Sequence, residues 1–459
     1  MMKLTRRQSL AAALVPLLPT VSCAVDEARP DGLVSPDLEL ALRPFDPAYW
    51  PGPILPSTQR ELAPIMQQAA AAMRERDLAL IERKVGIVIN ALGRYRGTPE
   101  VLPPYGRPIK FSAPDIRYVT NLVTKDYEAF AARGPWRDPK QRSTSPTTRL
   151  RITGRAAEAM IRLHLAGQGQ DGLFLQEATK ALDYAISVQA PNGVFGYPYI
   201  AEGGSGVARE AADLVRKQRA SGNELTHKGW IIDDLNKGGL EFDNAIIGTT
   251  LLLANEVAPR QDYVEAALRA GEWALPRPFV ININYNTLSA FLFARLFRVT
   301  GDQKWLEGAK DIFRYVVLPT QLNSGRWFDP HNARIEYHSI ILRHGLELLQ
   351  ALAVANDPMR TVMEDSLRRG LDNLAAQIVL FGSSNTEELL ASEALIIGEA
   401  LLGENRLWKI ATHIDINFLV DHLATALAAR GLPISPPLAL LVQQASALPA
   451  TSSFELSLI

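Results

Sequence analysis

The richest group of chemistry-bearing side chains lies at residues 326–338, Arg-Trp-Phe-Asp-Pro-His-Asn-Ala-Arg-Ile-Glu-Tyr-His. Its Asp-Pro pair is typical of a helix start, with Asp as the cap and Pro in the first turn. On the helix that follows, Arg334, Tyr337 and His338 are spaced i, i+3 and i+4, so they share one face. An arginine beside a phenol, whose ordinary pKa is about 10, favours the phenolate that can act as a base. We therefore predict a catalytic group of Tyr337, His338, Arg334 and His331, with Trp327 as a substrate contact. A buried polar network between two hairpins is the alternative.

A second group of polar and aromatic residues precedes another helix. His-Lys-Gly-Trp at 227–230 is followed by Asp233 and Asp234, and then by Gly-Gly-Leu-Glu-Phe-Asp-Asn at 238–244. We predict Asp243 as a catalytic carboxylate and Trp230 as a substrate contact. A plain helix cap is the alternative for Asp243.

Two further turns carry amides and aromatic rings at helix boundaries. Residues 189–199 read Gln-Ala-Pro-Asn-Gly-Val-Phe-Gly-Tyr-Pro-Tyr, and residues 282–287 read Asn-Ile-Asn-Tyr-Asn-Thr. Aromatic planes suit the apolar C–H faces of sugars, and amides can bind hydroxyls or a carboxylate. The predicted substrate-binding residues in these turns are Asn192, Tyr197, Tyr199, Asn284 and Tyr285. Ordinary helix termination at Gly193, with the aromatic residues packed under the loop, is the alternative.

The elements that must position these turns are paired helices. Three segments share one layout, an apolar helix, a short Gly-containing turn and an amphipathic helix: 162–188, 296–317 and 399–419. Similar pairs can be drawn at 244–274 and 338–379. Only Val-Ile-Asn-Ile-Asn at 280–284 alternates as a strand would. We therefore predict an all-α chain of helical hairpins.

Repeated hairpins must bury their apolar faces against one another, and a closed ring does this without leaving an exposed end. In this layout the chain resembles, over about residues 150–427, the α/α toroids of carbohydrate-active enzymes, which include six-hairpin glycosidases, lyases and epimerases. The resemblance implies a toroid of about six hairpins with its site where loops join helices at one end. We expect an export signal at 1–23, a proline-rich stalk or arm at 24–57 and the toroid domain at 58–459.

Shorter resemblances concern individual sites. The string Asn-Ala-Arg-x-Glu-Tyr-His at 332–338 is similar to the C-terminal domain of glucuronyl C5-epimerases over about twenty residues, which implies that Tyr337 is catalytic. The 189–199 turn resembles the Gln-x-x-x-Asn-Gly-Gly turns of pectate-lyase-like toroids. Asp243, after its Gly-Gly turn, resembles the sugar-facing carboxylates of toroid lyases and hydrolases.

Composition excludes several classes of protein. Lys and Arg number 48 against 49 Asp and Glu, and this balance gives no field suited to nucleic acid. No P-loop, His-Glu-x-x-His, paired-Cys or Gly-x-Ser-x-Gly motif occurs, and the 7 histidines show no metal-ligand spacing. Gly-x-Gly-x-x-Gly at 167–172 matches a dinucleotide fingerprint by letter but connects two helices with no strand before it. We expect neither a metal nor a cofactor.

The first residues predict export from a bacterial cell. Arg6-Arg7 precedes an apolar run at 10–18, and the surrounding residues resemble the twin-arginine consensus. Thr-Val-Ser-Cys at 20–23 resembles a lipoprotein cleavage box, so Cys23 is a candidate lipid anchor and a soluble periplasmic protein is the alternative. Because Cys23 is the sole cysteine, we expect no intramolecular disulfide.

Three functions stay open at this point. The first is an enzyme that removes the C5 proton of a uronate in an acidic polysaccharide, as a lyase or an epimerase; it needs a base and a group that neutralises the carboxylate. The second is a glycoside hydrolase with two carboxylates about 5 to 9.5 Å apart, drawn from Asp233, Asp234, Glu241 and Asp243. The third is a non-catalytic glycan-binding or assembly protein at the cell surface. We predict the first.

Overall fold

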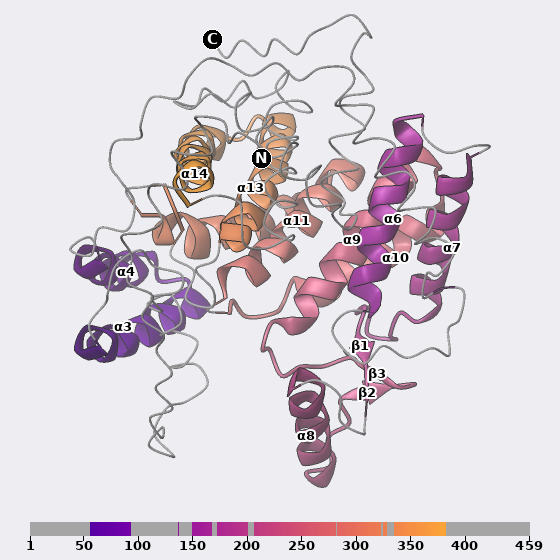
Figure 1. The fold of residues 1–459 in the computed structure, drawn as a ribbon, viewed down its shortest axis with the longest axis horizontal. Helices are drawn as coiled ribbons and strands as arrows, with labels where there is room; N and C mark the ends of the chain where they lie inside the picture. The colour runs from indigo at the N-terminus through magenta and orange to yellow at the C-terminus, as the bar shows by residue number, and fades with distance from the viewer. Residues whose placement is uncertain are drawn as a thin grey trace, which may run out of the picture. The chain divides into compact units, whose positions relative to one another are not determined.

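The computed structural model describes residues 56–92, 136, 149–167, 172–200, 206–280, 282–322, 325–327 and 335–381. The helices are α3 (Pro56–Glu75), α4 (Leu78–Leu92), α6 (Arg149–Leu165), α7 (Leu173–Ser187), α8 (Gly206–Ala220), α9 (Gly239–Val257), α10 (Gln261–Ala274), α11 (Ile283–Thr300), α12 (Gln303–Ile312), α13 (Ile335–Ala355) and α14 (Met359–Phe381). A π-helical turn, η4 (Phe313–Val317), and a 3₁₀ turn, η5 (Leu318–Thr320), continue α12. The protein is mostly helical, as predicted (Figure 1).

Consecutive helices pack as hairpins. The pairs are α3 with α4, α6 with α7, α9 with α10, α11 with α12 and α13 with α14. Helix α7 buries residues spaced three or four apart, among them Phe174, Ala178, Ala181 and Ala185, as an amphipathic outer helix does. The hairpins predicted at 162–188, 244–274, 296–317 and 338–379 are confirmed, whereas the predicted pair at 399–419 lies outside the described residues.

Four of these helices form an inner layer. Helix α6 packs on α9, α9 on α11 and α11 on α13, while α7, α10, α12 and α14 each pack on the inner partner of their own hairpin. Residues 240–254 of α9 and 286–297 of α11 are buried without interruption, because neighbours cover these helices on every side. This two-layer order agrees with a toroid over four hairpins, and a closed ring of about six stays a prediction.

The inner helices run in the same direction. Near their starts, Phe242 of α9 contacts Tyr285 of α11, and farther along the Thr249 carbonyl accepts a hydrogen bond from Arg295. Thr287 near the start of α11 likewise bonds His344 of α13, and Arg298 near its end bonds Gln350. The N-terminal ends of α9, α11 and α13 therefore lie toward one side of the inner layer.

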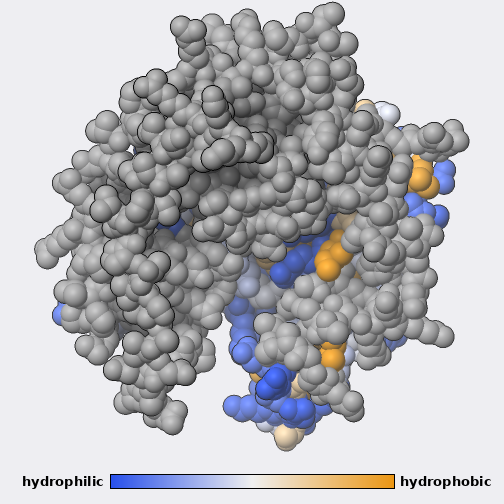
Figure 2. All heavy atoms as spheres, in the orientation of Figure 1, coloured by the Kyte–Doolittle hydropathy of each residue, from blue (hydrophilic) through white to orange (hydrophobic). Residues whose placement is uncertain are grey.

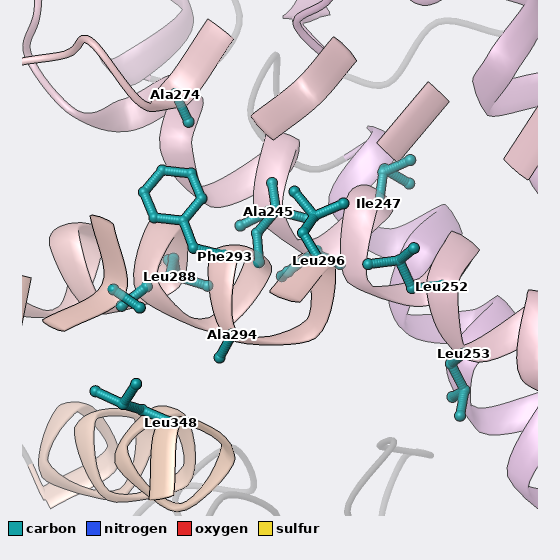
Figure 3. Close-up of a cluster of buried hydrophobic side chains, with 14 of the residues drawn as sticks. Ala245, Ile247, Leu252, Leu253, Ala274, Leu288, Phe293, Ala294, Leu296 and Leu348 are labelled. Carbon is teal, nitrogen blue, oxygen red and sulfur yellow. The ribbon is translucent and has the colours of Figure 1, made fainter. Parts of the chain in front are cut away.

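One apolar core cluster joins the inner helices to one another and to the outer layer. Figure 3 shows Leu348 of α13 beneath Ala294 of α11, with Phe293 and Ala245 on the far side of α11. Helices α9 and α11 approach closely at Gly248, where a Cβ atom would lie 2.8 Å from Leu292 Cδ1. A larger residue at this position would force the two inner helices apart.

A small β-unit connects α7 to α9. Strand β3 (Trp230–Ile231) pairs antiparallel with β1 (Tyr197–Pro198) on one side and β2 (Thr226–His227) on the other. Helix α8 covers this sheet with a separate apolar cluster that includes Val215, Leu225 and Ile231. Figure 2 shows hydrophilic side chains at the bottom of the view, where Figure 1 places α8.

The strand-like alternation at 280–284 leads into a helix, because α11 begins at Ile283 and Asn282 is its N-terminal flanking residue. Five alternating residues are too few to outweigh the helical burial pattern that follows, in which Ile283, Thr287 and Phe291 are all buried. In the described ranges, no helix is both long and apolar enough to cross a membrane.

Candidate functional site

A polar and aromatic cluster lies where the inner helices α6, α9 and α11 begin. Arg151 stands in the first turn of α6, and its Nη2 atom lies 2.9 Å from Asp243 Oδ2 on α9. The Arg151 guanidinium lies over the Phe242 ring, 3.5 Å from its centroid. The same Phe242 ring meets Tyr285 of α11 edge-on, with 6.4 Å between centroids. One aromatic ring therefore joins a cation and a phenol from three helices.

Asp243 acts within this cluster as a cap for a neighbouring helix. Its Oδ1 atom accepts a hydrogen bond of 3.0 Å from the backbone N–H of Arg151, one of the first-turn donors that α6 cannot satisfy itself. The alternative that Asp243 caps its own helix is wrong, because α9 begins at Gly239 and its N-terminal flanking residue is Gly238. The sequence cannot show this role, since α6 and Asp243 are far apart along the chain.

Burial determines the charge behaviour of Asp243. The side chain has an exposed fraction of 0%, and this burial raises the pKa of its carboxyl to about 6, although the charge and hydrogen bonds of Arg151 oppose the rise. Asp243 therefore holds Arg151 in place from the protein interior and does not itself face solvent.

Arg151 is the group in this cluster that can reach a ligand. Its side chain is 22% exposed, although its Nε–H is buried and has no hydrogen-bond partner. Guanidinium groups carry five donors in a planar fork that suits carboxylates. Tyr285, which meets Phe242 edge-on, is half-buried. The arrangement can hold an anionic group beside a phenol.

The other acidic residues near the start of α9 bind a different arginine. Asp234 pairs with Arg277 and accepts a 3.1 Å hydrogen bond from Leu240 N, so it caps α9. Glu241 Oε1 lies 2.7 Å from Arg277 Nε. Burial raises the pKa of Glu241, the charge of Asp234 raises it further, and Arg277 opposes both. These two carboxylates stabilise the start of α9.

The predicted aromatic contacts divide between this cluster and the small sheet. Tyr197 is 8% exposed, and burial together with the negative charges of Asp234 and Asp243 raises its pKa well above the ordinary value. Those charges act on Tyr197 because it lies near the cluster. Trp230, opposite Pro198 in the sheet, is half-buried. Tyr199 lies under the Arg219 guanidinium, 5.2 Å from its ring centroid.

The two predicted amide contacts lie in different settings. Asn192 is exposed and braces its own turn, since its Nδ2 donates to Ile232 O at 3.3 Å and its Oδ1 accepts from Val194 N at 3.3 Å. Asn284 is fully buried beside Tyr285, and its carbonyl accepts a 2.9 Å hydrogen bond from Thr287. Asn284 directly precedes Tyr285, a member of the Arg151 cluster, on α11.

The predicted catalytic group at 326–338 is only partly described. His338 and Trp327 are buried against each other, with 5.1 Å between ring centroids, and His338 Nε2 lies 2.9 Å from Gly370 O. Burial lowers the pKa of His338 to about 3, so the ring is neutral. In this structure both residues contact the outer helix α14 rather than solvent.

Tyr337 is half-buried on α13 and stands two helical turns before His344, on the same face. His344 bonds Thr287 of α11 through Nδ1 at 2.9 Å, so that face of α13 is turned toward α11. His331 and Arg334 lie outside the described residues, and the pairing of Arg334 with Tyr337 stays a prediction.

Farther along the inner layer, charged side chains cross between helices. Glu158 of α6 bonds Arg343 of α13 at 2.9 Å, and Glu347 of α13 bonds Arg295 of α11 at 3.0 Å. Burial raises the pKa of Glu158, but the charges of Arg343, Arg162 and Arg295 outweigh burial and lower it to about 2. These ion pairs fasten α6, α11 and α13 to one another.

Sequence reasoning missed Arg151 and the interhelical ion pairs. Their signal is the spacing of charged residues on an otherwise apolar helix: 151, 155, 158 and 162 recur every three or four residues along α6. Charged residues at this spacing lie on one face of α6, and on a buried helix such a face indicates polar contacts with neighbouring helices. No group of three or more His, Cys, Asp or Glu residues that could hold a metal ion occurs in the part of the chain that the structure describes.

Comparison with known proteins gives structural likenesses alone. No protein-family model matches the chain, and no curated protein matches it in sequence. A polysaccharide lyase has a similar solved structure, with a TM-score of 0.46 and 9% identity over 72% of this chain and 96% of the lyase chain. A family 88 glycosyl hydrolase from Bacteroides vulgatus is similar with a TM-score of 0.46 and 11% identity, over 73% of this chain and 98% of the hydrolase chain.

Proposed function

We propose that the protein is a carbohydrate-active enzyme that removes the C5 proton of a uronate in an acidic polysaccharide. The observation that carries the proposal is Arg151, held on Phe242 by the buried Asp243 and partly exposed near Tyr285. A fixed arginine and a phenol that contact the same aromatic ring provide the two groups that this chemistry needs, a carboxylate neutraliser and a base.

In the proposed reaction the uronate carboxylate binds the partly exposed guanidinium of Arg151. Neutralising the carboxylate makes the C5 proton more acidic, because negative charge develops on the carboxylate oxygens as that proton leaves. A tyrosine takes the proton, and Tyr285 and Tyr337 are the half-buried candidates. In a lyase the C4–O bond then breaks, its electron pair leaves with the oxygen, and a C4–C5 double bond forms. In an epimerase a proton returns to C5 from the opposite face.

The hydrolase alternative has less support from the geometry. It needs two carboxylates that reach the glycosidic bond from opposite sides. Asp234, Glu241 and Asp243 are all buried and paired with arginine, which leaves Asp233 as the half-buried carboxylate of that group. A non-catalytic glycan-binding protein would also use Arg151 and Tyr285, and activity assays separate it from the enzyme.

The test compares wild type with Tyr285→Phe and Tyr337→Phe on a panel of acidic polysaccharides. Two signals are followed: ultraviolet absorbance of an unsaturated product, and exchange of solvent deuterium into C5, which detects epimerisation without cleavage. We expect one of the variants to lose at least about a hundredfold in kcat, the usual contribution of a general acid–base group. Both variants keep the ring and its packing, so both should fold, which circular dichroism checks.

Cleavage of a neutral glycan without deuterium exchange, together with full activity of both variants, would contradict the proposal and favour the hydrolase. Binding of acidic polysaccharide with neither signal would favour the non-catalytic protein. The proposed place of action is the periplasm or the outer face of a membrane, reached through the twin-arginine-like signal and, in the second case, a lipid on Cys23.

A further inference from the structure

Arg155 is a second arginine beside the Arg151 cluster, one turn farther along α6. Its guanidinium lies over the Phe242 ring, 5.5 Å from the centroid, and the guanidinium of Arg151 lies 3.5 Å from the same centroid. Residues spaced i and i+4 share a helical face, so both arginines project from one face of α6. The charges of both act on the Asp243 carboxyl, where they oppose the rise in its pKa that burial causes. Two guanidiniums therefore meet at one aromatic ring.

The row of charged residues on α6 is accessible at its start and buried at its end. Arg155 is exposed, and the Arg151 side chain is 22% exposed. One turn farther, Glu158 is buried and bonds Arg343 of α13 at 2.9 Å, and the buried Arg162 beyond it bonds Glu158. Helix α13 thus contacts the later part of the row, whereas the first two arginines stay accessible. A ligand that binds Arg151 from solvent can therefore reach Arg155 as well.

The buried carboxylates at this end of the inner layer are directed at other arginines. Asp243 accepts from Arg151 with both of its oxygens, and Asp234 and Glu241 both pair with Arg277. Arg155 adds a positive charge at the exposed side of the cluster. A guanidinium carries five donors, so an exposed arginine can bind a ligand carboxylate in addition to a protein group.

The spacing of the two arginines suits a repeating anion. Four residues of an α-helix rise about 6 Å along its axis, which is of the same order as the length of one pyranose unit. In a polymer of consecutive uronates every sugar unit carries a carboxylate. In an alternating polymer an amino sugar separates one uronate from the next. Arginines on successive turns therefore match carboxylates on adjacent units.

We propose that Arg151 and Arg155 bind the carboxylates of two adjacent uronate units, so that the substrate is a polymer of consecutive uronates. Arg151 holds the carboxylate of the unit that loses its C5 proton, and Arg155 holds the carboxylate of its neighbour. Phe242, which both guanidiniums contact, helps to fix them by cation–π attraction. This inference rests on the proposed function and adds the class of polymer to it.

The experiment compares two kinds of oligosaccharide that carry the same number of carboxylates. Calorimetry measures binding of trimers of galacturonate, mannuronate or guluronate, and of hexasaccharides of hyaluronan and unsulfated chondroitin, in which uronate and amino sugar alternate. Wild type should bind one of the trimers at least about tenfold more tightly than either hexasaccharide, because a second charge-assisted carboxylate pair forms with the trimer alone. The quantity compared between variants is this ratio of affinities.

Arg155→Gln should lower the ratio at least about tenfold, since it removes the charge and the planar fork that bind the second carboxylate. Arg155→Lys keeps the charge without the fork, so it should lower the ratio less. Both replacements have helix propensities close to that of arginine, so both variants should fold, which circular dichroism checks.

Two further variants serve as controls. Arg151→Gln should weaken binding of both kinds of oligosaccharide, because either kind places one uronate carboxylate on Arg151. Arg83→Gln changes an exposed arginine in the interior of α4, outside the cluster. It should leave both affinities as in wild type, since salt screens exposed charges outside the site.

The outcomes separate this inference from the proposed function. If wild type prefers the alternating hexasaccharides, or if Arg155→Gln keeps the preference of wild type for trimers, the inference is wrong while the proposed function stands. If Arg155→Gln and Arg83→Gln weaken binding of both kinds alike, Arg155 acts through overall charge and the inference is again wrong. If wild type binds neither kind, the proposed function itself fails and the inference fails with it.

Discussion

Asp243→Asn tests whether the buried carboxylate is maintained at a cost to stability in order to orient Arg151. The replacement keeps the Oδ1 atom that accepts from Arg151 N, removes the negative charge and replaces the Oδ2 acceptor of Arg151 Nη2 with an NH2 donor. Asn has nearly the same volume as Asp, so no cavity is created. Any change therefore reports on the charge of Asp243 and on the orientation of Arg151.

The expected magnitude follows from the pKa of Asp243. Burial raises this pKa from its ordinary 3.8 to about 6. At about 1.4 kcal/mol for each pKa unit, ionised Asp243 lowers the free energy of unfolding by about 3 kcal/mol at pH 7. The folded protein binds more protons than the unfolded chain between pH 4 and 6, about the two pKa values, so this group makes stability fall as pH rises through that window.

The amide introduced by Asp243→Asn does not titrate, so the variant lacks the loss of stability that Asp243 causes as pH rises from 4 to 6. We expect the free energy of unfolding of the variant, relative to wild type, to rise by up to about 3 kcal/mol from pH 4 to pH 7. Urea unfolding followed by circular dichroism at several pH values measures it. The matched control is Asp233→Asn, a half-buried aspartate from the loop before α9.

A constant difference between variant and wild type across this pH range would refute the reasoning. The same variant should lose activity on acidic polysaccharide, because the amide holds the Arg151 guanidinium less firmly than the carboxylate does. A stability that grows relative to wild type as pH rises, with lower activity, is the combined result that the structure predicts.

Three further predictions concern the ion pairs and export. Glu158→Gln should lower the free energy of unfolding by about 3 kcal/mol at pH 7, because it leaves Arg343 and Arg162 without their shared carboxylate. The pKa of Glu158 in the folded protein, about 2, lies below the ordinary 4.5, so this stabilisation is present above pH 4.5 and is lost as pH falls toward 2. If the difference in free energy of unfolding between wild type and Glu158→Gln does not shrink in acid, this reasoning is wrong. Replacing Arg6 and Arg7 by Lys should leave precursor inside the cell, and Cys23→Ser should release a lipidated protein into the soluble periplasmic fraction. Unchanged fractionation in either case would reject the corresponding prediction.

Part of the candidate site could be predicted from residue types alone. Asp243 and Tyr285 stand near helix starts, and Tyr197 follows the end of a helix. In the structure the charge of Asp243 acts on Tyr197, and Phe242, the residue before Asp243, contacts Tyr285. Helix starts of one layer lie at the same end when the inner helices run in parallel, so local sequence predicts which residues can meet. The role of Asp243 as a cap for α6 was not predictable, because capping residues are ordinarily sought next to the helix that they cap.

The residues at 326–338 show the opposite case. Arg334, Tyr337 and His338 share a helical face by spacing, yet neighbouring positions on a helix differ by about 100° in direction, and His338 faces α14 while Tyr337 lies two turns before His344. The sequence predicts which side chains lie on one face, but only packing determines what that face contacts.

The sequence by itself determined the helical hairpins, because apolar spacing and Gly-containing turns are local properties of the chain. It also determined that Asn and Asp residues gather at the helix starts. Only the tertiary structure decided that Asp243 caps α6 and that Arg151 and Arg155 lie over the ring of Phe242. The physical reason is that each of these contacts depends on which helices become neighbours, and the packing of the whole inner layer sets that order.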